Sequence, residues 1–221
     1  MLFDLKGKRR RTVQITYVAL AFLMAVGLVG AGVGSGTSGG IFDLFGGGSG
    51  HSNANKLVEN RIKAAQKQLL LNPKNQAALT ALVRAHYDLA TADENQQTGA
   101  FGKDGKKELA LAASAWQRYV NTNPKKPDAS LAAAMLNAFG VRGLNRPADA
   151  STTAEIVALA QNSAQAYLRL TACATAAGQT RKANLAAATA AKKAGKAQAA
   201  AVTQLIKQAT NPTTARALCS Q

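Results

Sequence analysis

Aromatic and strand-forming side chains are scarce in this sequence. Only 5% of its 221 residues are aromatic although 47% are hydrophobic, and alanine makes up much of that hydrophobic share. Clusters of Val, Ile, Tyr and Phe, which favour strands, hardly occur after residue 45. Alanine favours helices but buries little area per residue. The composition therefore disfavours a sheet-based core and predicts an all-α fold of thin, closely packed helices.

The residues that catalysis and metal binding require are equally scarce. The chain has two histidines, His51 in a Gly/Ser-rich stretch and His86 in a predicted helix, where it fits a core or groove-edge position. Phosphate-binding glycine loops, nucleophile elbows, His-x-x-x-His pairs and Cys-x-x-Cys motifs do not occur. The acidic residues between positions 88 and 104 lack the alternating spacing and the glycine of a calcium loop. We therefore predict a protein that is not an enzyme and has no catalytic residue, metal site or cofactor.

Acidic residues end at Glu155, although the chain as a whole carries a formal net charge of +16. Residues 156–221 hold eight basic side chains and no acid: Arg169, Arg181, Lys182, Lys192, Lys193, Lys196, Lys207 and Arg216. Such a region attracts anions, among them lipid head groups and cell-wall polymers. The alternative is that these side chains only keep an alanine-rich surface soluble. Nucleic acid is disfavoured, because the region lacks the interleaved aromatic side chains on which bases stack.

A long stretch without charged residues covers positions 12–33. Its 22 residues would make a helix of about 33 Å, which spans the roughly 30 Å hydrocarbon core of a bilayer. Five basic residues precede it within positions 1–11, and such clusters stay in the cytoplasm. We therefore expect a single-pass transmembrane helix at the cell membrane, with a basic cytoplasmic tail at 1–11 and the rest of the chain extracytoplasmic. A cleaved signal peptide is the alternative, because Val29-Gly30-Ala31 offers small residues for cleavage.

The chain after this stretch first has the composition of a linker and then the apolar spacing that is typical of helices. Gly and Ser dominate residues 34–53, and such a segment cannot bury enough surface to offset its ordering cost, so it predicts a flexible linker. Farther on, apolar residues recur three and four apart, and we expect Leu82 and Trp116 to pack between helices. Proline cannot continue a helix, and three Asn-Pro pairs interrupt the pattern: Asn72-Pro73, Asn123-Pro124 and Asn211-Pro212.

Two segments resemble tetratricopeptide repeats, a family of stacked helical hairpins. "NPKNQAALTALVRAHYDLA" (72–90) is similar to the turn and first helix of a repeat. "AQAYLRLTACATAAGQTRKANLAAATAAKKA" (164–194) fits a whole helix pair, with Gly178 at the turn and the small residues Ala183 and Ala190 at the close helix contact. The resemblance implies an α-solenoid of helical hairpins over about residues 72–195.

The domain limits follow from this resemblance and from its departures. A polar insertion at 92–108 and a degenerate middle unit at 128–162 do not follow the repeat pattern. Repeat arrays need capping ends, and residues 55–71 and 195–209 fit that role. We therefore predict a repeat domain at 54–210 and a C-terminal tail at 211–221.

The resemblance also implies which residues form the binding surface and what kind of ligand they bind. In this family the first helix of each pair lines a groove, and the matching positions here are Arg84, Tyr87 and Asp88 in the first unit, Phe139 in the middle unit and Arg169 in the third. We expect an interaction scaffold whose groove holds a protein or peptide with apolar anchors and some acidic character. With its anchor, the chain resembles bacterial cell-envelope proteins of protein export, envelope assembly or quality control. The alternative is a cationic envelope module that binds an anionic lipid or a cell-wall polymer.

The two cysteines leave two readings open. Cys173 lies in a repeat helix and Cys219 in the predicted tail. In an oxidising compartment they can form a disulfide that fastens the tail. The other reading is a buried Cys173 and a free Cys219.

Overall fold

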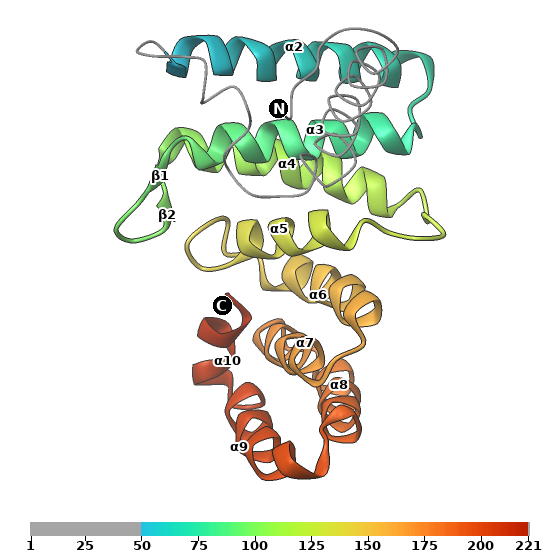
Figure 1. Cartoon of the computed structure of the whole chain (residues 1–221), viewed down its shortest axis with the longest axis vertical. Helices are drawn as coiled ribbons and strands as arrows, with labels where there is room; N and C mark the ends of the chain where they lie inside the picture. Colours follow the sequence, from blue (N-terminus) through green and yellow to red (C-terminus); the bar gives the residue numbers. More distant parts are fainter. Residues whose placement is uncertain (1–49, 221) are drawn as a thin grey trace, which may run out of the picture. The chain divides into compact units, whose positions relative to one another are not determined.

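Residues 50–220, with side chains from residue 55 onward, are the part of the chain that the computed structural model describes. They form nine α-helices and one small hairpin, and the residues from Ala54 onward belong to one compact unit (Figure 1). The helices are α2 Gly50–Leu71, α3 Gln76–Thr91, α4 Lys103–Val120, α5 Ala129–Phe139, α6 Pro147–Gln161, α7 Ala164–Ala176, α8 Thr180–Lys193, α9 Ala199–Ala209 and α10 Pro212–Cys219. A 3-10 turn, η2, covers Lys196–Gln198 between α8 and α9. The predicted all-α fold is confirmed for this part of the chain.

Consecutive helices pack as antiparallel pairs, α3 with α4, α5 with α6 and α7 with α8 (Figure 1). The pairs follow one another along the chain, so that α6 also packs against α7. The predicted degenerate middle unit is therefore an ordinary helix pair. Gly178 lies at the turn of the third pair with φ +70°, a conformation that costs glycine little, which confirms its predicted position.

Short polar side chains begin several of these helices. Asn75, Asp128 and Ser163 each accept a hydrogen bond from the backbone N–H three residues later, at 3.1, 3.0 and 3.2 Å. Such caps satisfy N–H groups that have no partner inside the helix. At the other end of α6, Asn162 adopts a left-handed conformation, which Asn tolerates better than most residues.

The polar insertion forms a hairpin and the start of α4. The strands β1 (Glu94–Asn95) and β2 (Ala100–Phe101) pair antiparallel around Gly99. The helix begins at Lys103, inside the predicted insertion at 92–108. Asp93 explains the difference, because its carboxylate accepts a hydrogen bond from the Gly105 N–H at 2.7 Å and so caps the first turn from outside the helix.

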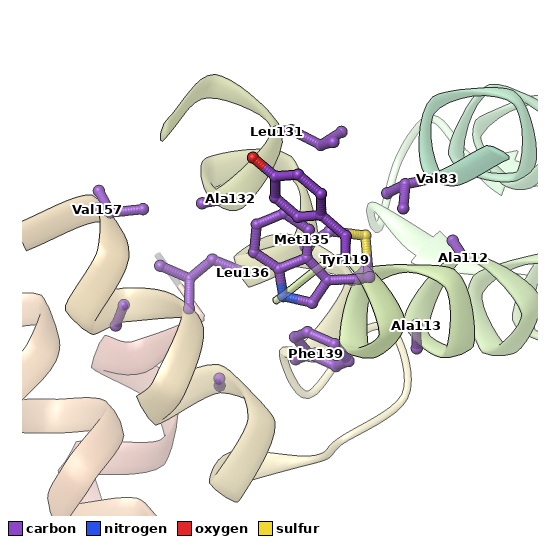
Figure 2. Packing of buried hydrophobic residues seen from close by; sticks show 14 of the residues in the cluster. Val83, Ala112, Ala113, Tyr119, Leu131, Ala132, Met135, Leu136, Phe139 and Val157 are labelled. Carbon is purple, nitrogen blue, oxygen red and sulfur yellow. The ribbon is translucent and has the colours of Figure 1, made fainter. Parts of the chain in front are cut away.

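One cluster of buried side chains joins all the pairs, from Ala65 in α2 to Cys219 in α10. Figure 2 shows part of it, where Tyr119, Met135 and Leu136 point toward the same buried region. Many members are alanines, which allow helices to approach closely. The predicted core positions of Leu82 and Trp116 are confirmed, because both are buried.

The predicted membrane-spanning helix, residues 12–33, lies outside the described residues, as do the predicted cytoplasmic tail at 1–11 and most of the linker at 34–53. Within residues 50–220, no helix is both long enough and apolar enough to cross a bilayer. The predicted fold class and location are therefore corrected. The fold that is shown is helical, and the transmembrane helix and the single-pass membrane location are not retained.

The residues predicted as a C-terminal tail, 211–221, instead include a helix that packs on α7. Asn211 caps α10 by accepting a hydrogen bond from the Thr213 N–H at 2.9 Å, and Pro212 occupies its first turn. An Asn-Pro pair ends one helix but also starts another, because proline is favoured at the first helical position. Our prediction treated Asn211-Pro212 only as the end of a helix and not as the start of the next one.

Candidate functional site

Polar side chains from the first helices of the three pairs lie near Asn137 of α5. Arg169 on α7 donates from Nη2 to Asn137 Oδ1 on α5 at 3.0 Å. Tyr87 on α3 lies near the same Asn137, and both side chains line one cleft. The structure thus places two of the predicted groove residues, Tyr87 and Arg169, beside Asn137, a residue that we did not predict for the groove.

Tyr87 is held as a neutral phenol. Burial is the main reason that the pKa of Tyr87 lies above the ordinary value. The nearby Asn137 side chain lowers this pKa, and the carboxylates of Glu94 and Asp88 raise it further. The hydroxyl therefore keeps its proton throughout the physiological pH range and can both donate and accept a hydrogen bond.

Tyr87 and Asn137 lie in the wall of an open cleft of about 550 Å³. The hairpin, the connection between α5 and α6, and the end of α10 form the rest of the wall. The lining residues are Tyr87, Glu94, Gly99, Phe101, Asn137, Gly140, Val141, Arg142, Ala217 and Ser220. This set combines an apolar surface with a few polar groups of both charges, as ligand-binding sites do.

Hydrogen bonds between distant segments hold the rim of this cleft. The Ser220 hydroxyl accepts a hydrogen bond from the Val141 N–H at 3.1 Å, which ties the end of α10 to the α5–α6 connection. The Phe101 N–H donates to the Arg142 carbonyl at 3.3 Å, which ties the hairpin to the same connection. The cleft is therefore built by contacts that cross the helix pairs.

The predicted groove residues Arg84 and Asp88 lie beside this cleft rather than in it. Arg84 Nη2 lies 2.6 Å from Asp128 Oδ2, and Asp128 is the cap of α5. Asp88 is exposed, and partial burial of its carboxylate raises its pKa although the cations Arg61 and Arg84 lower it. Arg84 therefore has a structural partner within the fold, and Asp88 gives the surface near Tyr87 a negative charge.

The prediction that Phe139 lines the groove is wrong. Its side chain is 1% exposed and belongs to the core, with the Arg146 guanidinium 5.8 Å from the ring centroid. Asn137 is the α5 residue that faces the cleft. Its signal was present in the sequence, because Ser130 and Asn137, seven residues apart, are the two polar residues of α5 and mark its exposed face.

The end of α10 takes up part of the hydrogen-bonding capacity of Arg169, a predicted groove residue. Its Nε donates to the Cys219 carbonyl at 3.3 Å, and a cation is favourable at the C-terminal end of a helix. Burial lowers the pKa of this guanidinium, which nevertheless stays charged. Cys219 forms a disulfide with Cys173 in α7, so α10 covers the face of the third pair that its predicted groove would use.

The described side chains include one histidine, His86, which is paired with a carboxylate. His86 Nδ1 lies 2.7 Å from Glu108 Oε2 across α3 and α4, and His86 is buried as a core position requires. Within residues 55–220, no hydroxyl forms a hydrogen bond with this histidine, as a serine hydrolase triad would need. The same residues contain no group of three or more His, Cys, Asp or Glu placed to hold a metal ion.

The geometry thus comprises three consecutive helix pairs, a hydrogen bond between the first helices α5 and α7, and a cleft between the hairpin and α10. This arrangement is compatible with a helical repeat fold. In comparisons with known proteins, no protein-family model, no curated protein and no solved structure matches this chain.

Proposed function

We propose that the protein is a tetratricopeptide-like scaffold that binds an extended segment of a partner protein in the cleft beside Tyr87 and Asn137. The observation that carries the proposal is that Tyr87 of α3 and Asn137 of α5 line one open cleft, and that Asn137 accepts a hydrogen bond from Arg169 of α7, so that the first helices of three successive pairs contribute polar groups near it. In tetratricopeptide repeats the first helices line the binding surface, as the resemblance in the sequence implies.

The packing of the pairs supports the repeat assignment. Ala183 and Ala190, which match small-residue positions of the family, are buried. Gly178 has the positive φ that a tight helix–helix turn needs. Because each pair packs chiefly on its neighbours, the arrangement has the nearest-neighbour character of a repeat array.

The chemistry of the cleft favours a peptide as its ligand. Tyr87 and Asn137 offer a hydroxyl and an amide to a peptide backbone, and Phe101 and Val141 offer apolar surface to a side chain. Glu94 and Arg142 place one charge of each sign in the wall. A segment that satisfies these groups would have an apolar anchor flanked by polar residues.

The experiment that tests this function begins with a random displayed-peptide library selected on the wild-type protein. Selected peptides are then synthesised with a fluorophore, and their dissociation constants are measured by anisotropy. Tyr87→Phe removes only the hydroxyl in the cleft, and we expect it to weaken binding by about threefold to tenfold, the usual effect of one lost hydrogen bond. Asn137→Ala should weaken binding at least as much.

The chain offers matched controls for both changes. Tyr167→Phe removes a hydroxyl on α7 that does not line the cleft, and Asn60→Ala shortens an exposed side chain on α2. Neither should change the dissociation constants. Failure to select any peptide, or equal binding by the cleft variants and their controls, would contradict the proposed site.

A further inference from the structure

A second open surface lies between α2 and α4, apart from the cleft described above. We call it the α2–α4 furrow and define it by its lining residues Gln66, Leu69, Leu70, Leu82, His86, Leu111, Ser114, Ala115 and Arg118. Leu82 and His86 of α3 form its floor, since both are buried. Side chains of α2 and α4 form its two walls, and the furrow encloses about 500 Å³.

Large apolar side chains remain in contact with water along this furrow. Leu70 is 84% exposed and Leu111 is 49% exposed, one on each wall. Leu71, next to Leu70, is also exposed. Single exposed leucines are common on protein surfaces, whereas apolar side chains gathered around a hollow are typical of interaction sites.

The charge around the furrow is positive. No acidic side chain lines it, and the carboxylate of Glu108 is already paired with His86. Arg118 lines the furrow but takes part in none of the five ion pairs found within residues 55–220. Lys63 and Lys67, exposed on α2, lie seven and three residues before Leu70, so they approach the same wall.

We propose that the α2–α4 furrow binds an amphipathic helix of a partner protein, with leucine-like anchors against Leu70 and Leu111 and an acidic side chain against Arg118. A helix fits because two helices bound the hollow and a third can pack its ridge of side chains between them. An acidic side chain is favoured because Arg118 forms no ion pair within residues 55–220 and no anion lines the furrow. This site goes beyond the proposed function, since it uses a different surface and a different ligand conformation.

The test uses three synthetic fluorescent peptides of about 18 residues, or five helical turns. The first has leucines at positions i, i+3, i+4 and i+7 and glutamates beside them. The second has lysines in place of the glutamates, and the third has serines in place of the leucines. We expect the wild-type protein to bind the first peptide and to bind the other two at least about tenfold more weakly.

Variants of the full chain locate the binding. Leu70→Ser combined with Leu111→Ser should weaken binding of the first peptide by about tenfold or more. Its matched control combines Leu159→Ser on α6 and Leu185→Ser on α8, two leucines that are also exposed but lie outside the furrow. Arg118→Gln should reduce the preference for glutamate over lysine by about threefold, the scale of one exposed ion pair.

Each of the other outcomes overturns the proposal. Equal loss of binding in the furrow variant and in the control would mean nonspecific adsorption to leucines. Equal binding of the glutamate and lysine peptides would contradict the charge argument. If sedimentation shows a wild-type dimer that the furrow variant alone converts to a monomer, and no peptide binds, the occupant is a second copy of this chain. Thermal unfolding by circular dichroism verifies that all variants keep their helices.

Discussion

At the scale of single residues, Trp116 connects two neighbouring helix pairs. Its ring is 2% exposed, and its Nε1–H donates to the Thr153 hydroxyl of α6 at 3.0 Å. Its ring centroid lies 5.4 Å from that of Tyr119. A buried indole thus combines apolar area with a satisfied polar group, at a place where α4 of one pair meets α6 of the next.

The first prediction follows from this contact. Trp116→Ala should lower the free energy of unfolding by about 3–5 kcal/mol, because it leaves a cavity and an unpaired Thr153 hydroxyl. Urea unfolding followed by circular dichroism measures the change. Leu159→Ala, at an exposed position of α6, is the control and should change stability by no more than about 0.5 kcal/mol. A Trp116→Ala protein as stable as the wild type would contradict the packing between these pairs.

The second prediction concerns the pH dependence that Asp128 confers. Burial raises the pKa of this carboxyl, but hydrogen bonds from the Leu131 N–H, the Ser130 hydroxyl and the Arg84 guanidinium outweigh that effect, so the pKa lies below the ordinary value of an aspartate. The folded state therefore favours the ionised form. The resulting stability is present above the unfolded pKa and is lost as the pH falls through the lower, folded pKa.

Asp128→Ala should cost about 1 kcal/mol at pH 7, the usual value of a helix cap. The difference from the wild type should shrink as the pH falls below about 3.8, because the wild-type carboxylate then loses its charge. Urea unfolding at a series of pH values measures it. Asp104→Ala, which removes the exposed partner of Lys107, should show no comparable pH dependence. A constant difference between the wild type and Asp128→Ala would argue against the charged cap.

At the scale of helices and strands, most elements could be predicted because their signals are local. Apolar spacing indicated α3, α4 and α7, and Gly178 indicated the turn before α8. The start of α4 could not be found in this way, because Asp93 caps it from outside the helix. α10 was missed because Asn211-Pro212 carries both a stop signal and a start signal.

The candidate site was less predictable than the helices. Tyr87 and Arg169 could be named from the repeat pattern, since both lie on the first helix of a pair. Phe139 was named as the matching position of the middle unit, whereas the rotation of α5 buries its ring and exposes Asn137 two residues earlier. The cleft itself depends on the hairpin and on the end of α10, which approach α5 from distant parts of the sequence. No local sequence pattern indicates a contact between segments that are so far apart in the sequence.

The third prediction is that the disulfide holds α10 in place. α10 has eight residues, too few for a stable isolated helix, and of these only Ala215 and Cys219 are buried. The disulfide closes a loop with a sequence separation of 46 residues. By loop entropy this contributes up to about 4 kcal/mol. Replacement of both cysteines by serine should therefore release α10 before the remaining helices unfold.

Hydrogen exchange measured by mass spectrometry can detect this local release. Peptides from residues 212–219 should lose protection in the double variant, while peptides from α3 and α4 keep theirs. Reduction of the wild-type protein under mild conditions should reproduce the effect, and alkylated wild-type protein that was never reduced is the control. Uniform loss of protection over the whole unit would show that the disulfide supports the fold rather than α10 alone.

At the scale of the whole described unit, the helix pairs form a line of neighbours that share one continuous core. α3 packs mainly on α4, whereas α7 packs on α6, α8, α9 and α10. In such an array, the free energy of unfolding is the sum of terms for each repeat and terms for the interfaces between repeats. A destabilising substitution at one end therefore lowers the stability of distant repeats only through these interfaces. In a single cooperative domain, the same substitution would instead lower the stability of all helices equally.

The fourth prediction distinguishes these two behaviours. Leu79 of α3 and Leu170 of α7 are both buried, and truncation of either to alanine should cost about 2–5 kcal/mol. In a repeat array, Leu79→Ala should reduce hydrogen-exchange protection most in α3 and α4, and Leu170→Ala should reduce it most in α6 to α10. The two variants are matched in chemistry and differ in position, so each serves as the control for the other. If both lower protection equally from α3 to α10, the unit unfolds as one cooperative body, and the tetratricopeptide-like array proposed for it would have to be abandoned.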